Sequence, residues 1–293
     1  MTLRQWAALV VAALGWGTGG VATRAAFGAD VEVWTMVAGR AAIAGLVVLG
    51  LVAIRRELRP TVDELRIGWV MAVFNLAGPY VLFTFAYASA SAGFVGLLAA
   101  LIPLATAVFA HVMLDDEQLT RAKIVGLAAA FAGVASLGLS GDSGLAEGGR
   151  PLFALGLSLA AVAAIGYAGA YAKRAAGDYR TLPVTGLQFG FGAALLVPAM
   201  FVFEGAPTGL TAAGWGLVVY MATVSTVVPF VVYYRLLQDV SATQVSLVGY
   251  LVPLVAVVGG IVLLGERLQA GMVLGGALIL LGVVLADRAD RLR

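Results

Sequence analysis

The fold of this chain is decided by a stretch of sequence that occurs twice. Residues 91–104 read SAGFVGLLAALIPL, and residues 241–254 read SATQVSLVGYLVPL, with seven of the fourteen positions identical. Pro103 and Pro253 occupy the same place in the two apolar runs, 150 residues apart. A duplicated apolar sequence with helix breakers at matching positions is typical of membrane transporters built from two structural repeats.

The composition places most of the chain in lipid. Of its 293 residues 61% are hydrophobic and only 12% are charged, against about 25% charged residues in an ordinary soluble domain. The mean hydropathy is +0.99. The absence of cysteine excludes disulfides, thiol nucleophiles and cysteine-liganded metals. We find no P-loop of the form GxxxxGK[ST] and expect no cofactor, metal or nucleic-acid partner.

Ten segments are long and apolar enough to span a bilayer, which takes about 20 residues. We therefore predict an all-α integral membrane protein with two five-helix repeats, residues 1–143 and 144–293, forming one transport domain. The polar loop SGDSGLAEGGRP separates them. Because each repeat has an odd number of spans, the second must be inverted relative to the first. The predicted spans are 5–27, 31–54, 65–86, 91–113, 119–140, 152–174, 181–203, 211–236, 240–264 and 268–287.

The distribution of basic residues predicts that both termini are cytoplasmic. With that orientation, 14 of the 18 lysines and arginines lie on the inner side, as the positive-inside rule requires. Arg24, Arg150 and Arg267 lie outside, and Arg40 lies within a span. The inner residues are Arg4, Arg55, Arg56, Arg59, Arg66, Arg121, Lys123, Lys173, Arg174, Arg180, Arg235, Arg288, Arg291 and Arg293.

The set of motifs resembles the drug/metabolite transporter superfamily, specifically its EamA-type members. The resemblance rests on ten spans in two halves, the pair Trp16–Gly17, Arg40 in the second span, the repeated prolines, and the acids Glu117 and Glu266 after the fourth and ninth spans. It covers the whole chain and is closest to the bacterial aromatic-amino-acid exporters. It implies export of amino acids or other small metabolites through a central cavity. One departure is the first-half turn LDDEQL, one residue longer than LGERL in the second half.

Repeated proline pairs and mid-span aromatic residues mark the predicted transport site. Pro79 and Pro229 lie in the third and eighth spans, 150 residues apart, and Pro103 and Pro253 lie in the fourth and ninth. A proline frees a backbone carbonyl one turn earlier and permits a kink. We interpret the two pairs as hinges for alternating access, although single prolines often only shape membrane helices. We predict that substrate is bound by Trp16, Asn75, Tyr80, Tyr167, Tyr171, Gln244 and Tyr250.

Each polar side chain near the predicted cavity can either bind substrate or have a structural role. Tyrosine and tryptophan at mid-span need hydrogen-bond partners away from hydrocarbon, which favours a cavity wall over a lipid-facing position. Asn75 and Gln244 can bind substrate or join helices. Arg40 can bind helix-end carbonyls, a structural role that we favour, or a substrate carboxylate. His111, the only histidine, is interpreted as interfacial rather than as a proton relay.

These features predict a secondary transporter or facilitator in the bacterial inner membrane that exports amino acids or similar amphipathic metabolites. All 16 acids lie near predicted loops or helix ends, which disfavours strong proton coupling. The first alternative, an exporter of drugs or other metabolites, usually requires a buried carboxylate for cationic substrates. An intramembrane enzyme would need a catalytic set that we do not find, so no enzymatic activity is expected. A structural or receptor membrane protein is the other remote alternative, and it would not require paired mid-span prolines. Gly271 and Gly275 suit close helix packing within one chain, and we expect a monomer.

Overall fold

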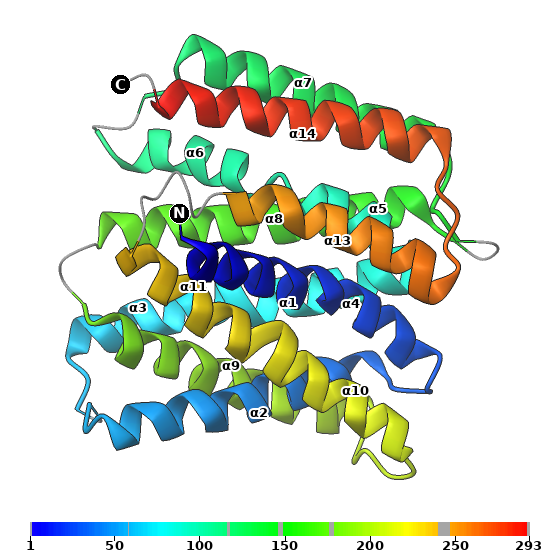
Figure 1. Cartoon of the computed structure of the whole chain (residues 1–293). Coiled ribbons are helices and arrows are strands. Elements are labelled where there is room, and N and C mark those ends of the chain that lie inside the picture. Colours follow the sequence, from blue (N-terminus) through cyan, green and yellow to red (C-terminus); the bar gives the residue numbers. More distant parts are fainter. Residues whose placement is uncertain are drawn as a thin grey trace.

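The computed structural model describes residues 2–57, 59–115, 118–145, 149–175, 179–239 and 247–291. These residues form a bundle of long helices that run along a common direction (Figure 1). In chain order the elements are α1 (Leu3–Phe27), α2 (Val33–Ile54), α3 (Val62–Met71), η1 (Ala72–Ala77), α4 (Gly78–Ser89), α5 (Ala92–Ala99), α6 (Ile102–Met113), α7 (Arg121–Leu139), α8 (Pro151–Arg174), α9 (Thr181–Phe203), α10 (Ala212–Ala222), η2 (Thr223–Val227), α11 (Val228–Asp239), α13 (Leu247–Leu264) and α14 (Ala270–Arg291).

Most of the predicted spans appear as continuous apolar helices. Within the described residues, eight helical segments are long and apolar enough to cross a membrane, and two shorter ones cover Val248–Leu264 and Ala270–Ala286. The third span is longer than predicted, Val62–Ser89 instead of 65–86. It begins earlier because Thr61 and Glu64 form a capping box that sequence periodicity alone does not reveal.

The ends of the bundle differ in charge. Helix α1 begins and α14 ends at the same end of the bundle, which is also reached by the connection after α2 (left in Figure 1). That connection carries Arg55, Arg56 and Arg59. These described arginine-rich segments therefore share one end of the bundle.

Helices at equivalent positions of the two halves pack against each other in antiparallel pairs. In the pair α2–α9, Gly45 lies against Phe189 and Gly186 lies against Val52. In the pair α7–α14, Gly133 lies against the carbonyl of Gly275. Other helix contacts in one half have an equivalent in the other. The contact α1–α13 corresponds to α6–α8, and α1–α11 corresponds to α4–α8. This exchange symmetry is the pattern expected when a two-fold rotation relates two halves of a chain.

Glycine is required where α7 and α14 meet, because their backbones are in direct contact. A Cβ atom at Gly133 would lie 2.5 Å from the carbonyl oxygen of Gly275, and one at Gly275 would lie 2.8 Å from the carbonyl oxygen of Gly133. A Cβ atom at Gly271 would lie 2.5 Å from the side-chain Cβ of Ser140. The prediction that Gly271 and Gly275 pack within the fold is therefore confirmed.

Two spans contain a π-helical turn just before a proline. In η1 the N–H of Gly78 donates to the carbonyl of Val73, and in η2 the N–H of Val228 donates to the carbonyl of Thr223, both five residues back. Pro79 and Pro229 follow these donors and have no N–H of their own. The helix widens by one residue at each site, as π-turns inside α-helices do.

The second proline pair is less symmetric. The fourth span breaks between α5 and α6, where the N–H groups of Ala100 and Leu101 bond to carbonyls only three residues back. Pro103 follows this tightened turn near the start of α6. Pro253, in contrast, lies inside the continuous helix α13. Identical sequence positions therefore give a broken span in one half and an unbroken helix in the other.

Candidate functional site

Arg40 is held by residues of the opposite half of the chain. Its Nε donates to Thr226 Oγ1 at 2.8 Å, and its Nη2 donates to the carbonyl of Ser225 at 3.3 Å. Its guanidinium carbon lies 4.2 Å from the centre of the Tyr80 ring, a cation–π distance. Among the described residues no acid pairs with it. Both hydrogen-bond acceptors belong to η2, so Arg40 joins α2 to the π turn of the eighth span.

The carbonyl that Arg40 binds is available because of Pro229. In a regular α-helix the carbonyl of Ser225 would accept the N–H of residue 229, which is proline here. The carbonyl is thus left without its helical donor. A buried carbonyl needs a partner, and a guanidinium with five donors supplies one. Arg40 therefore binds a backbone carbonyl that a proline has left without its helical donor.

Thr226 connects three elements through one hydroxyl group. Its Oγ1 accepts from Arg40, donates to the carbonyl of Met221 at 2.8 Å, and lies 3.4 Å from the hydroxyl of Tyr80. Thr226 has no exposed surface. The first half contributes Arg40 and Tyr80, and the second half contributes Thr226 and the carbonyl of Ser225. We call this set of four residues the Arg40 cluster.

Ser225 has a hydroxyl that the structure does not satisfy. The residue has no exposed surface, and its Oγ has no hydrogen-bond partner among the described residues. It faces α1, where a Cβ atom built on Gly19 would lie 3.8 Å from this oxygen. The Arg40 cluster therefore includes a buried hydroxyl that makes no hydrogen bond within the described part of the chain.

A group of aromatic rings lies between α1 and α11. Trp16 packs edge-on against Phe230 with centroids 5.5 Å apart, and tilts against Tyr233 at 5.3 Å. Phe230 also contacts Phe189 at 5.9 Å. Phe230 and Tyr80 pack on the same buried apolar cluster. Phe230 therefore contacts the predicted site residue Trp16 and shares a core with the predicted site residue Tyr80.

A second aromatic group lies in the other half of the symmetric arrangement. Tyr167 contacts Phe74 at 5.0 Å, Phe109 at 5.8 Å and Tyr171 at 6.2 Å. These rings come from η1, α6 and α8. The predicted residues Tyr167 and Tyr171 thus lie together, in a ring group separate from that of Trp16.

The remaining predicted residues are distributed over the bundle. Asn75 is half-buried within η1, at the position equivalent to Ser225. Tyr250 packs against the apolar core that contains Phe94 and Leu98. Gln244 lies outside the described residues. That these seven residues line one substrate site stays a prediction.

Three of the four predicted hinge prolines are buried, namely Pro79, Pro229 and Pro253, and Pro103 is exposed. Pro79 and Pro229 are the two that follow the π turns. His111 is exposed at the end of α6, consistent with an interfacial position.

The carboxylate of Glu266 joins several helices at the end of the bundle opposite the arginine-rich segments. Glu266 accepts from the N–H of Ala92 at 2.8 Å and of Gly93 at 3.4 Å, the first residues of α5. Arg24 Nε lies 3.9 Å from Glu266, and Arg24 Nη1 donates to the carbonyl of Tyr87 at 3.0 Å. Anionic side chains are favourable at a helix N-terminus. This contact ties α1, α4 and α5 to the segment after α13.

Two further contacts were not predicted from sequence. Glu204 accepts from the N–H groups of Trp34 and Thr35, both at 2.7 Å, and so caps the start of α2. The Arg180 Nε donates to Glu64 at 2.8 Å and links α3 to the start of α9. Thr226 was also missed. Its only sequence signal is its place three residues before Pro229, where freed backbone groups were expected.

Comparison with known proteins identifies the architecture. The sequence profile of the EamA-like transporter family matches residues 5–139 and residues 152–286. The chain belongs to the EamA-like transporter family. Family membership and the apolar helices make it a multi-pass membrane protein that transports a small-molecule substrate. Proteins of this family are transporters rather than enzymes.

Several EamA-related proteins resemble the chain over most of its length. It is 27% identical over 252 residues to a Streptantibioticus cattleyicolor protein named "Probable terminal-alkyne amino-acid exporter", covering 85% of this chain and 80% of that protein. It is 24% identical over 233 residues to "Uncharacterized transporter YoaV" of Bacillus subtilis, covering 79% and 78%. A solved structure titled "Crystal structure of protein" superimposes with a TM-score of 0.64 at 22% identity, covering 99% of both chains, which shows the shared fold.

Proposed function

We propose that this EamA-family protein is a secondary transporter that exports amino acids or similar small amphipathic metabolites across the bacterial inner membrane. Ten spans form two inverted repeats, residues 1–143 and 144–293, with both termini in the cytoplasm. The protein works by alternating access through a central cavity between the halves. The named amino-acid exporter among its relatives supports this substrate class.

The observation that carries the proposal is the Arg40 cluster beside the Trp16 ring group. A guanidinium, a buried hydroxyl of Ser225 with no partner among the described residues, and the rings of Trp16 and Phe230 come from both halves. A zwitterionic solute needs donors for its carboxylate and an apolar surface for its side chain. These neighbouring groups offer both. Tyr80 completes the polar wall, and Asn75, Tyr167, Tyr171, Gln244 and Tyr250 serve substrate in other steps of the cycle.

The orientation of the halves follows from the antiparallel pairs. Equivalent helices related by a two-fold axis in the membrane plane must run in opposite directions. The pairs α2–α9 and α7–α14 do so, with Gly45 near Phe189 and Gly133 near Gly275. This packing supports inverted repeats. The shared position of the arginine-rich segments supports a cytoplasmic location for that end.

The π turns supply the moving parts. Each carries a carbonyl, of Asn75 or Ser225, whose helical donor is replaced by proline. A helix with one missing bond bends there at lower cost than elsewhere. We assign Pro79 and Pro229 as the main hinges, with Pro103 and Pro253 as secondary ones. Arg40 holds the second hinge in the described conformation through the Ser225 carbonyl.

Transport of labelled amino acids into proteoliposomes tests the substrate class. We expect saturable uptake of aromatic or large aliphatic amino acids that is independent of a pH gradient, because the sequence places no acid at mid-span. Gradient-driven uptake would contradict the absence of proton coupling. Uptake of lipophilic cations instead of amino acids would establish the alternative, an exporter of drugs or other metabolites.

Matched tryptophan variants test the site. Trp16→Ala is expected to raise the KM for uptake, since it removes a ring packed against Phe230 and Tyr233. Trp215→Ala is the control, because that side chain is 40% exposed on α10. Equal kinetics in the two folded variants would remove Trp16 from the site.

Matched proline variants test the hinge. Pro229→Ala gives residue 229 an N–H that competes with Arg40 for the Ser225 carbonyl, so exchange should slow more than substrate affinity falls. Pro198→Ala is the control, because Pro198 lies inside α9 and is exposed. If Pro229→Ala exchanges at the rate of the control variant, the hinge assignment is wrong.

A further inference from the structure

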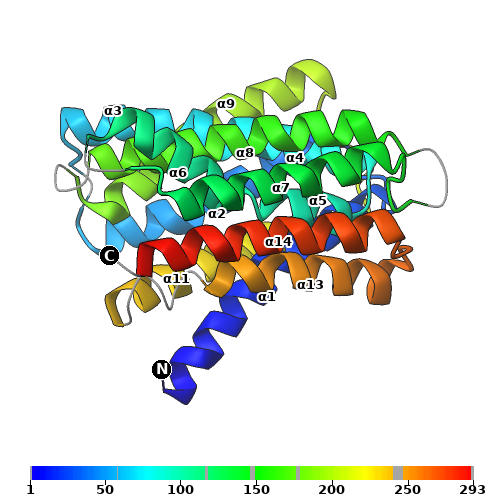
Figure 2. The same ribbon diagram turned by 90° about the horizontal axis from the view of Figure 1, so that it is seen from above.

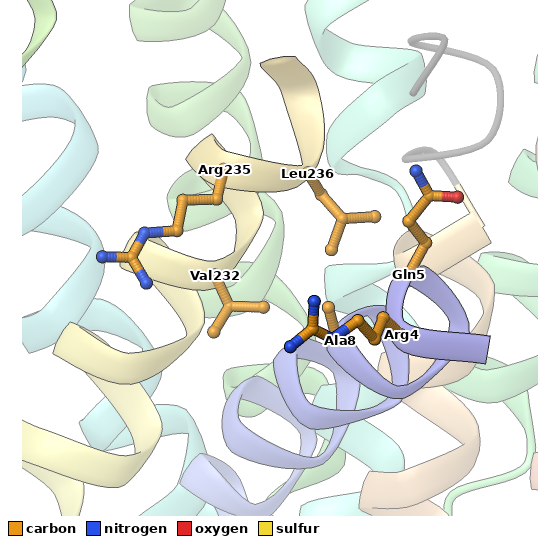
Figure 3. A pocket seen from close by; sticks show the side chains of 6 residues that line it. All are labelled: Arg4, Gln5, Ala8, Val232, Arg235 and Leu236. Carbon is orange, nitrogen blue, oxygen red and sulfur yellow. The ribbon is translucent and has the colours of Figure 1, made fainter. Parts of the chain in front are cut away.

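A cavity lies between α1 and α11 at the arginine-rich end of the bundle, away from the Arg40 cluster. Its volume is about 230 Å³. Figure 3 shows Arg4 and Gln5 on the first turns of α1 across from Val232 and Leu236 of α11, with the Arg235 side chain at the outer edge of the cavity. Arg4 and Trp16 are twelve residues apart on one helix, which corresponds to about 18 Å. The cavity is therefore distinct from the proposed substrate site.

The lining combines two positive charges with an apolar floor. Arg4 and Arg235 are both exposed, and Ala8, Val232 and Leu236 form the apolar part. No acid lines the cavity, and among the described residues neither guanidinium makes a hydrogen bond or ion pair. Two like charges beside one cavity repel each other. An anion in the cavity would lower that repulsion, and it would accept hydrogen bonds from both guanidinium groups once the exposed Arg235 side chain turns inward.

The first turns of α1 also expose apolar side chains. Trp6 is 46% exposed, Val10 42% and Val11 43%. Val11 borders the cavity face of the helix, and Trp6 and Val10 lie on the opposite face, because successive residues turn by 100°. Figure 2 shows the first turns of α1 extending away from the other helices. Tryptophan at this position is typical of the membrane–water interface. The charged rim thus lies at headgroup depth, and the apolar surface lies at acyl-chain depth.

We propose that this cavity binds the phosphate headgroup of an anionic phospholipid from the adjacent leaflet, with Arg4 and Arg235 as the phosphate ligands and Gln5 as an additional donor. Basic pockets between membrane helices bind such headgroups. A guanidinium suits a phosphate because it presents paired donors in a planar fork. The acyl chains lie beside Val11 of α1. The bound lipid bridges the two helices that carry Trp16 and Phe230.

Native mass spectrometry of the purified full chain tests the site without measuring transport. The protein is titrated in detergent with phosphatidylglycerol and, separately, with phosphatidylcholine. We expect a preference for phosphatidylglycerol, and a loss of affinity of about thirtyfold in Arg4→Gln/Arg235→Gln, from roughly 1 kcal/mol for each arginine. The control Arg55→Gln/Arg66→Gln removes the same charge from exposed positions at the same end and should bind as the unmodified protein does.

A charge-neutral variant separates the site from general electrostatics. Ala8→Phe fills the cavity floor, keeps both arginines, and should also weaken phosphatidylglycerol binding. Equal loss in the Arg55/Arg66 control would mean that net charge alone attracts the lipid, which would overturn the proposal. Undiminished binding in Arg4→Gln/Arg235→Gln and in Ala8→Phe would do the same. Displacement of the lipid by inorganic phosphate at matched concentration would assign the site to free anions and overturn the lipid assignment.

Discussion

Replacing Thr226 with valine isolates the contact that joins the two halves at Arg40. Valine has nearly the shape of threonine but no hydroxyl. The change removes the acceptor of the 2.8 Å bond from Arg40 Nε and the donor of the 2.8 Å bond to the Met221 carbonyl. Because Thr226 has no exposed surface, water cannot replace that hydroxyl from outside.

The loss of stability in Thr226→Val depends on the charge of the hydrogen-bond donor, the Arg40 guanidinium. A hydrogen bond to a charged group contributes about 1.5–3 kcal/mol, whereas interhelical hydrogen bonds in a membrane protein average about 0.6 kcal/mol. Arg40 is half-buried and keeps its bond to Ser225 and its contact with the Tyr80 ring. We therefore expect Thr226→Val to lower the free energy of unfolding by about 2 kcal/mol.

Reversible unfolding in mixed micelles, titrated with dodecyl sulfate, measures this difference. The matched control is Thr223→Val in the same π turn, whose hydroxyl donates only to the Val219 carbonyl of its own helix. It should change stability by less than about 0.5 kcal/mol. In a double-mutant cycle, Arg40→Met and Thr226→Val should couple by about 1–2 kcal/mol. Equal destabilisation by the two threonine variants, or additivity in the cycle, would refute the inter-half link.

Two further predictions concern helix packing and capping. Gly133→Ala should destabilise the protein by about 1–3 kcal/mol in the same unfolding assay, because its Cβ would lie 2.5 Å from a carbonyl oxygen of α14. Gly216→Ala meets no atom within 4 Å and should be neutral or stabilising, so similar losses would disprove the close contact. Glu204→Gln should cost about 1 kcal/mol, since it weakens two bonds to the start of α2. Glu32→Gln, at a position with no capping bond, should not, and a reversed order would contradict this assignment.

Much of the architecture could be predicted from the sequence because its causes are local. The length of an apolar run sets whether a helix can cross the membrane, and the repeated motif revealed two related halves. The effect of Pro229 was also predictable, because the missing N–H always frees the carbonyl four residues earlier. Helix ends were less accurate, since capping by Thr61 and Glu64 extends the third span beyond its apolar core.

The partners of the predicted residues could not be derived in the same way. Trp16 and Tyr167 open matching sequence stretches, yet they belong to separate aromatic groups on α1–α11 and on η1, α6 and α8. The rings around each of them come from other helices, and these rings differ between the halves. Phe109, for example, has Gly259 as its counterpart 150 residues later, so equivalent backbone positions carry different side chains.

The sequence by itself determined the membrane environment, the duplicated organisation and the positions of the helix breakers. Only the tertiary structure decided that Arg40 meets the carbonyl of Ser225, 185 residues away, and that Glu266 caps α5. The physical reason is the range of the interactions. Hydrophobic length and proline geometry act within one helix, whereas a buried guanidinium or carboxylate is satisfied by whichever backbone group the packed bundle brings within about 3 Å.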